Sequence, residues 1–161
     1  AFVGQNYGAK RMDRVLKGYK STLLISCILG LFTTIVLIVF GEKLFSIFIN
    51  ETEAIKQGAD YLRILGYSQL FMCIESTLAG TLNGIGKTFI PSCISSTLTA
   101  ARIPMVMVLS TTFLGFNIEL LGINGIWWSI SSSSIIKGVL LITLFTIMVV
   151  RPLRKEIVLE F

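Results

Sequence analysis

Three charged side chains stand inside otherwise apolar stretches of this sequence: Glu75, Arg102 and Lys137. A charge near the centre of a membrane-length apolar helix costs roughly 3 kcal/mol or more when it faces lipid, so each of the three is expected to face a cavity or a partner. Two roles are open for Glu75. It is either part of a transport pathway for cations, or one half of a structural ion pair with Arg102 or Lys137.

The residues around Glu75 favour a position beside a water-filled cleft. On a helix, which turns by about 100° per residue, this segment presents two different faces. One face is apolar and is expected to contact lipid: Tyr67, Phe71, Ile74, Leu78, Leu82 and Ile85. The other is polar or small and holds the candidate pathway residues: Ser68, Gln69, Glu75, Ser76, Ala79 and Asn83. The alternative is that these small and hydroxyl residues only allow close helix–helix packing.

The segments that carry Arg102 and Lys137 have features of their own. Pro104 lacks an N–H, and its ring clashes with the carbonyl group of Ala100, so a kink is expected there. Bent helices recur near the midplane of transporters, and a fixed structural kink is an equal alternative. The run 131–134 is four serines and precedes Lys137. Such hydroxyls can bond to their own helix backbone, so the run alone indicates little.

Metal and enzyme chemistry find little support in the sequence. It contains no His, and Cys27, Cys73 and Cys93 lie in apolar stretches, where small buried residues are expected. No nucleophile–base pair is apparent beyond scattered serines. We therefore predict no metal, no cofactor and no enzymatic activity. The basic residues also lack the interleaved aromatic residues of a nucleic-acid-binding patch.

The composition predicts an integral membrane protein whose partner is the lipid bilayer. Of its 161 residues 53% are hydrophobic and only 14% are charged, against about a quarter charged in soluble domains. Uncharged runs of about twenty residues match a hydrocarbon core of about 30 Å. We predict an all-α fold whose four spans lie at about 19–40, 64–86, 88–114 and 123–150. Outside them, residues 44–48 are expected at the membrane interface and 51–63 in a surface helix.

The distribution of Lys and Arg orients these spans. If the spans alternate in direction, one side carries nine basic residues: Lys10, Arg11, Arg14, Lys17, Lys20, Lys87, Arg151, Arg154 and Lys155. The other side carries three: Lys43, Lys56 and Arg63. The positive-inside rule therefore places both ends of the chain in the cytoplasm. Trp127 and Trp128 would then lie near the outer interface, as membrane anchors or as packed core residues.

This pattern predicts three regions. Residues 1–18 are expected to form the end of a preceding helix and a basic cytoplasmic loop. Residues 19–150 are expected to form the four-helix transmembrane part, and residues 151–161 a basic cytoplasmic tail.

Several motifs together resemble the MATE (multidrug and toxic compound extrusion) transporter family. The stretch "VGQNYGAKRMDRVLKG" resembles the place where a GQN-x-GA motif, here Gly4, Gln5, Asn6 and Gly8, closes a helix before a basic cytoplasmic loop. "ADYLRILGYSQLF" and "AGTLNGIGKT" are similar to that family's tenth helix. "RIP" and "LGINGIWWS" resemble its eleventh helix and the entry to its twelfth. The similarity covers nearly the whole chain in the right order, which implies the C-terminal third of a MATE protein.

The resemblance implies the properties of a whole transporter. It implies twelve helices in two six-helix lobes around a cleft, with the N-terminal lobe missing here. It implies antiport across the plasma membrane, in which a small organic, often cationic, compound leaves and H⁺ or Na⁺ enters. Many members carry Asp where this chain has Met72, and Arg where it has Asn83, so the substrate and the coupling ion stay open. Glu75, one turn after Met72, is a candidate substitute for that Asp.

Two alternative functions also stay open. One is a lipid-linked-sugar flippase of the same superfamily, for which Arg102 and Lys137 would supply cations in the cleft. The other is a membrane assembly subunit that does not transport. An upstream half with the same repeat would separate a transporter from such a subunit.

Overall fold

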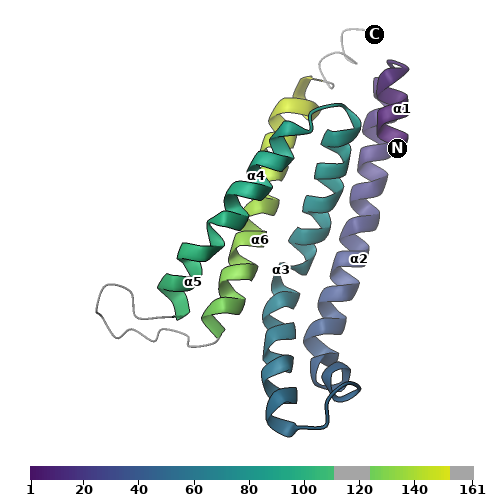
Figure 1. The fold of residues 1–161 in the computed structure, drawn as a ribbon. Helices are drawn as coiled ribbons and strands as arrows, with labels where there is room; N and C mark the ends of the chain where they lie inside the picture. Colours follow the sequence, from purple (N-terminus) through teal and green to yellow (C-terminus); the bar gives the residue numbers. More distant parts are fainter. Residues whose placement is uncertain (111–123, 153–161) are drawn as a thin grey trace.

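Every element in the described part of the chain is a helix (Figure 1). The structure, a computed structural model, describes residues 1–110 and 124–152. In chain order the elements are α1 (Phe2–Gly8), α2 (Met12–Ser46), α3 (Thr52–Gly84), α4 (Phe89–Ala100), α5 (Arg102–Ser110), α6 (Asn124–Phe145) and a short π-helical segment, η1 (Thr146–Val150). The all-α prediction is confirmed for these residues. The end of the third predicted span, at 111–114, and most of the predicted tail lie outside them.

The helices run up and down beside one another, in agreement with spans that alternate in direction. Figure 1 shows α2 descending, α3 rising, α4 and α5 descending in line, and α6 rising again. The turn from α3 to α4 is tight because Gly86 adopts a φ of +80°, which favours glycine. As a result α1 and the end of η1 lie at the same end of the bundle.

Two helices are longer than the predicted spans. The helix α2 has 35 residues, and at about 1.5 Å per residue it exceeds the hydrocarbon thickness. Charged residues at its two ends interact favourably with the helix dipole: Asp13 lies in the first turn and Lys43 in the last. The predicted surface helix and second span form one continuous helix, α3. Of residues 44–48, which are predicted to lie at the membrane interface, the first three complete α2.

Near Pro104, where the sequence predicts a kink, the structure has a break between two helices. The helix α4 ends at Ala100, and α5 begins at Arg102. Because Pro104 has no N–H, it cannot donate to the carbonyl group of Ala100. The ladder resumes at once, with the Met105 N–H donating to the carbonyl oxygen of Ala101 at 3.2 Å.

The predicted lipid-facing side of α3 was wrong for most of its length. Leu78 and Leu82 are fully buried, and Ile85 is 8% exposed, so these residues form the core. They lie in one cluster with Leu141 and Phe145 of α6, which bury apolar surface of their own at the same level. Tyr67 alone of the predicted set is strongly exposed.

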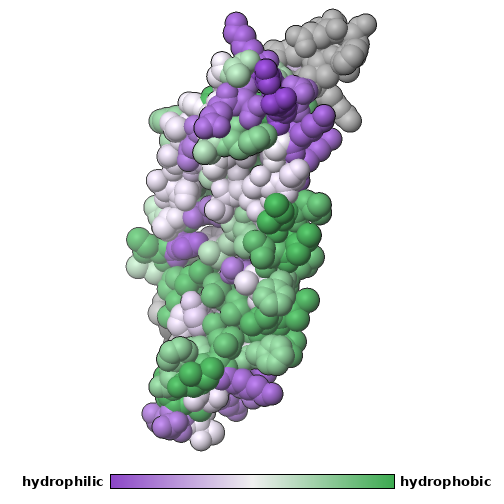
Figure 2. All heavy atoms as spheres, turned by 90° about the vertical axis from the view of Figure 1, so that its right-hand side faces the viewer, coloured by the Kyte–Doolittle hydropathy of each residue, from purple (hydrophilic) through white to green (hydrophobic). Residues whose placement is uncertain are grey.

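The outward apolar surface belongs instead to α2. Its exposed residues recur every three or four positions: Leu24, Ile28, Phe32, Ile35 and Val39. Figure 2 shows this side of the molecule as an apolar band with hydrophilic residues at both ends. Such a band is what a helix facing lipid requires.

Length and apolar composition together qualify two of the described helical stretches as membrane spans, Met12–Ser46 and Asn124–Val150. The prediction named four. The helix α3 is long enough, with 33 residues, but Gln69, Glu75 and several hydroxyl residues lower its hydropathy. The third predicted span is divided by the break into α4 and α5, which have 12 and 9 residues.

Candidate functional site

Lys137 is the centre of a polar cluster inside the bundle. It projects from α6 and is only 5% exposed. Its ammonium group donates to the hydroxyl of Thr99 at 2.9 Å and to that of Ser95 at 3.4 Å, both on α4. The carboxylate of Glu75, on α3, lies 4.0 Å from the Lys137 Nζ atom. Three helices therefore meet at one buried cation.

Glycine brings α6 close enough to α3 for this contact. A Cβ atom at Gly138, the residue after Lys137, would lie 3.0 Å from the Cβ atom of Phe71 and 3.2 Å from its carbonyl oxygen. A larger residue would push the two helices apart at this level. The sequence thus sets the distance between Glu75 and Lys137 through a neighbour that carries no charge.

Glu75 is held less tightly than Lys137. Its side chain is 20% exposed, and the 4.0 Å separation from the Lys137 Nζ atom is too long for a hydrogen bond. Within the described part of the chain, no other cation lies within ion-pair distance of its carboxylate. The carboxylate is therefore near a positive charge but is partly exposed and not hydrogen-bonded to it.

Arg102 does not pair with Glu75, so of the two predicted partners the structure selects Lys137. The half-buried guanidinium group of Arg102 donates from Nε to Ser133 at 2.6 Å and from Nη2 to Ser134 at 3.1 Å. Both hydroxyls donate hydrogen bonds to the carbonyl oxygen of Ile130. Arg102 thus fastens the start of α5 to α6 immediately after the helix break.

The structure does not bring the remaining pathway candidates into this cluster. Ser76 and Asn83 are exposed and Gln69 is half-buried. Residues seven apart share a helix face, and Ser68 lies on the Glu75 side, toward α6. Glu75 lies beside Lys137 of α6, whereas Ser76 and Asn83, at the other edge of the predicted polar face, are exposed.

The serine run of α6 forms interhelical contacts that the sequence analysis did not predict. The hydroxyl of Ser131 lies 2.6 Å from the carbonyl oxygen of Ile64 and 3.1 Å from the hydroxyl of Ser68. Ser131 and Ser68 are both fully buried. Their signal in the sequence was four adjacent hydroxyls in an apolar helix, next to a lysine.

The glycine motif serves helix packing at the basic end of the bundle. A Cβ atom at Gly4 would lie 2.9 Å from the carbonyl oxygen of Gly84, so α1 and α3 touch through their backbones. Asn6 donates to the carbonyl oxygen of Phe2. Gln5 is exposed, and a Cβ atom at Gly8 would meet nothing within 4 Å.

The cysteines are less buried than predicted, and the tryptophans pack against other rings. Cys93 is exposed, whereas Cys27 and Cys73 are half-buried. Trp127 and Trp128 are half-buried and contact aromatic rings of α3, at centroid distances of 4.5 Å to Tyr61 and 6.1 Å to Tyr67. Of the two predicted roles for the tryptophans, packing is therefore realised. Among the described residues, no group of three His, Cys, Asp or Glu side chains could hold a metal ion.

The profile of the MatE family matches residues 1–108. A similar protein is the "Probable multidrug resistance protein NorM" of Thermotoga maritima, which is 27% identical over 144 residues. The aligned region covers 89% of this chain and 30% of that protein, so the chain spans about 30% of the length of the relative that it matches. Members of the family are transporters and not enzymes. The match over two thirds of the sequence shows that this chain belongs to the MatE family of membrane transport proteins.

Proposed function

We propose that the chain is part of a secondary active multidrug efflux antiporter, which exports organic, often cationic, compounds in exchange for H⁺ or Na⁺. Family membership and the name of the relative support this function at the level of the whole protein. The observation in the chain itself is the cluster of Glu75 and Lys137. Ionisable residues inside a membrane bundle are expensive and usually mark ion or substrate pathways.

In this proposal Glu75 handles the coupling ion. The ammonium group of Lys137 already donates hydrogen bonds to two hydroxyls of α4. It therefore does not depend on the carboxylate of Glu75 as a hydrogen-bond acceptor. At 4.0 Å the ammonium group still attracts Glu75. A coupling cation that reaches Glu75 therefore competes with this attraction, and its binding weakens the connection between α3 and α6.

The break at Ala101 provides a place where such a change could move a helix. The segment α4 is tied to α6 through Lys137, and α5 is tied to α6 through Arg102. These two contacts lie on either side of the break, which allows α4 and α5 to move separately. Discontinuous helices near a binding site are common in secondary transporters.

The proposed architecture is four membrane-crossing helices of a six-helix C-terminal lobe, with an N-terminal lobe supplied by sequence outside this chain. The proposed location is the plasma membrane with both ends in the cytoplasm. Seven described basic residues gather at the end of the bundle that carries α1 and η1: Lys10, Arg11, Arg14, Lys17, Lys20, Lys87 and Arg151. This asymmetry supports the orientation through the positive-inside rule.

The flippase alternative depended on several cations lining an open cleft. Lys137 is buried and held by hydroxyls of α4, and Arg102 is held by serines of α6. Neither observation favours an anionic substrate over a cationic one. No observation on the described residues favours a membrane assembly subunit. We therefore keep the antiporter as the proposed function.

Efflux by the complete transporter tests the role of Glu75. Glu75→Gln keeps size and hydrogen bonding but removes the charge. We expect efflux of ethidium from proteoliposomes driven by an H⁺ or Na⁺ gradient to fall toward the level of empty liposomes, because the charge that binds the coupling ion is gone. The matched control is Glu53→Gln, an exposed carboxylate in the first turn of the same helix. Wild-type efflux and wild-type stability in Glu75→Gln would leave Glu75 without a role in coupling or in structure.

A further inference from the structure

The start of α2 and the loop before it carry most of the positive charge at the basic end of the bundle. Residues 10–20 include five basic residues and one acidic residue, Asp13. The five basic side chains are all exposed: Lys10, Arg11, Arg14, Lys17 and Lys20. Within the described part of the chain, none of them takes part in an ion pair. This segment therefore carries an excess of positive charge that no pairing with a described carboxylate neutralises.

Two of these lysines begin a stripe that continues as the outward apolar side of α2. Positions three or four apart share a helix face, and Lys17 and Lys20 are followed at such intervals by four apolar residues. These are 51–63% exposed: Leu24, Ile28, Leu31 and Ile35. From Leu24 to Ile35 the helix rises about 16 Å, close to half of a hydrocarbon core of about 30 Å. One exposed surface therefore joins two cations to an apolar strip as deep as one leaflet.

The stripe does not take part in the contact between α2 and α3. That contact uses other positions of α2, where Ser26 is hydrogen-bonded to Thr77 and Thr34 donates to the carbonyl oxygen of Gly66 at 3.1 Å. Figure 2 shows the outward side, with hydrophilic side chains gathered beside the apolar band at the end that carries α1. The lysines and the apolar strip thus share a surface that α3 leaves open.

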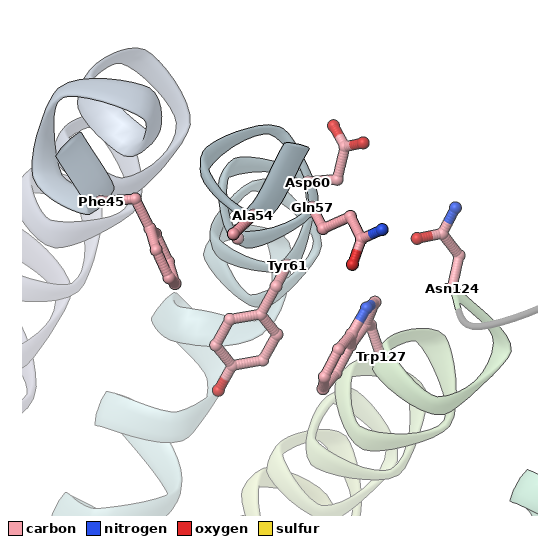
Figure 3. A pocket seen from close by; sticks show the side chains of 8 residues that line it. Phe45, Ala54, Gln57, Asp60, Tyr61, Asn124 and Trp127 are labelled. Atoms are coloured by element: carbon pink, nitrogen blue, oxygen red, sulfur yellow. The ribbon is translucent and has the colours of Figure 1, made fainter. Parts of the chain in front are cut away.

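The opposite end of the bundle differs in its charges. Its three basic residues are mixed with four acidic ones: Glu42, Glu51, Glu53 and Asp60. Arg63 pairs with Glu42 at 3.0 Å and with Asp60 at 3.5 Å. Figure 3 shows the carboxylate of Asp60 beside a pocket between the end of α2 and the starts of α3 and α6. The two ends of α2 therefore differ, and its start is the end that favours an anion.

The ligand that matches this surface has an anionic headgroup and apolar chains. A soluble phosphate would neutralise the lysines but leave the apolar strip uncovered. A zwitterionic lipid or an apolar helix would cover the strip but leave the ammonium groups without a counter-ion. Clusters of basic residues directly beside a membrane-spanning helix attract anionic lipids. Lysine side chains are also long enough to lie along the helix and place their charge at the headgroup level.

We propose that the start of α2 binds an anionic glycerophospholipid. Lys17 and Lys20 hold its phosphate group, and an acyl chain follows the strip that begins at Leu24. In the orientation proposed above, this lipid lies in the cytoplasmic leaflet. Its binding needs neither an ion gradient nor a transported compound. A failure of this proposal can therefore be distinguished from a failure of the antiport proposal.

Quenching by brominated lipids measures binding at one position of the helix. The complete transporter, in a cysteine-free background, carries Leu24→Cys labelled with bimane and is placed in nanodiscs of phosphatidylcholine and phosphatidylglycerol. One of the two lipids at a time has dibrominated chains, which quench a fluorophore that they contact. We expect phosphatidylglycerol to associate at position 24 about tenfold more strongly than phosphatidylcholine, because two cations adjoin the site. The matched control is Val39→Cys, an exposed position near the other end of the same helix, which should show no such preference.

Substitution of the lysines tests the headgroup contact. Lys17→Gln combined with Lys20→Gln should reduce the preference at position 24 to about twofold or less, and about 1 M salt should weaken it in the wild type. Lys43→Gln, the matched lysine in the last turn of α2, should leave the preference unchanged.

Four outcomes would overturn the proposal. They are equal association of the two lipids, a preference that persists in the double lysine variant, and displacement of the lipid by soluble glycerol 1-phosphate. The fourth is the absence of quenching by either lipid at position 24, which would show that another part of the complete transporter covers this face.

Discussion

The contact between Glu75 and Lys137 makes a quantitative prediction for a double-mutant cycle. Lys137→Met removes the ammonium group and leaves a carboxylate that is only 20% exposed without its cation. Removing one partner of a buried pair costs about 3–5 kcal/mol, and we expect about 3 kcal/mol here because Glu75 keeps some exposure. Glu75→Gln should cost only about 1 kcal/mol, because Thr99 and Ser95 continue to satisfy the ammonium group.

The double variant should nearly recover the wild-type free energy of unfolding. With both charges gone, neither is left buried and unpaired, so the expected loss is about 1 kcal/mol or less. The interaction energy of the cycle is then about 3 kcal/mol. It is measured by unfolding in mixed micelles of increasing SDS fraction, followed by tryptophan fluorescence. Efflux should nevertheless remain lost in the double variant, because the carboxylate that handles the coupling ion is absent.

An exposed ion pair in the same chain supplies the control. Glu42 and Arg63 lie 3.0 Å apart, but their side chains are 63% and 47% exposed. The same cycle with Glu42→Gln and Arg63→Met should give an interaction energy of at most about 1 kcal/mol. If the Glu75 and Lys137 effects are additive within about 0.5 kcal/mol, the contact has no energetic weight and the reasoning fails. Full efflux in the stable double variant would refute the coupling role alone.

Three further predictions concern packing and topology. Gly4→Ala should lower stability by about 1–3 kcal/mol relative to Gly80→Ala in thermal unfolding, because its Cβ atom would lie 2.9 Å from a backbone oxygen of α3 whereas that of Gly80 meets nothing. Equal melting of the two variants would contradict the contact between α1 and α3. Ser131→Ala should cost about 1 kcal/mol in SDS unfolding, since it removes a buried interhelical hydrogen bond, and an unchanged midpoint would contradict this. In a cysteine-free background, Lys17→Cys should react with an impermeant reagent only from the cytoplasmic side and Thr52→Cys only from the outer side, and outside labelling at position 17 would overturn the orientation.

Much of the architecture follows from local properties that the sequence displays directly. Runs of about twenty apolar residues are enough to predict membrane helices. The break beside Pro104 follows from a missing N–H, which is a property of one residue. Helix lengths were predicted less well, because charged first and last turns extend helices beyond the apolar run.

The site was only partly predictable for a different reason. The sequence alone identifies Glu75, Arg102 and Lys137 as candidates, because a charge in an apolar helix is costly wherever it points. Which charge meets which depends on the rotation and spacing of helices that are distant in the sequence. The glycine at 138 sets one of those distances through close contact with Phe71, a contact that no local pattern reveals.

The sequence by itself determined that this is a helical membrane protein of the MatE family, with three charges that need partners and a basic end. The tertiary structure decided that Lys137, rather than Arg102, lies beside Glu75. It also decided that the apolar side of α3 packs against α6 while α2 faces outward. The physical reason is that an apolar face is satisfied equally well by lipid or by another helix. Only the positions of the neighbouring helices choose between them.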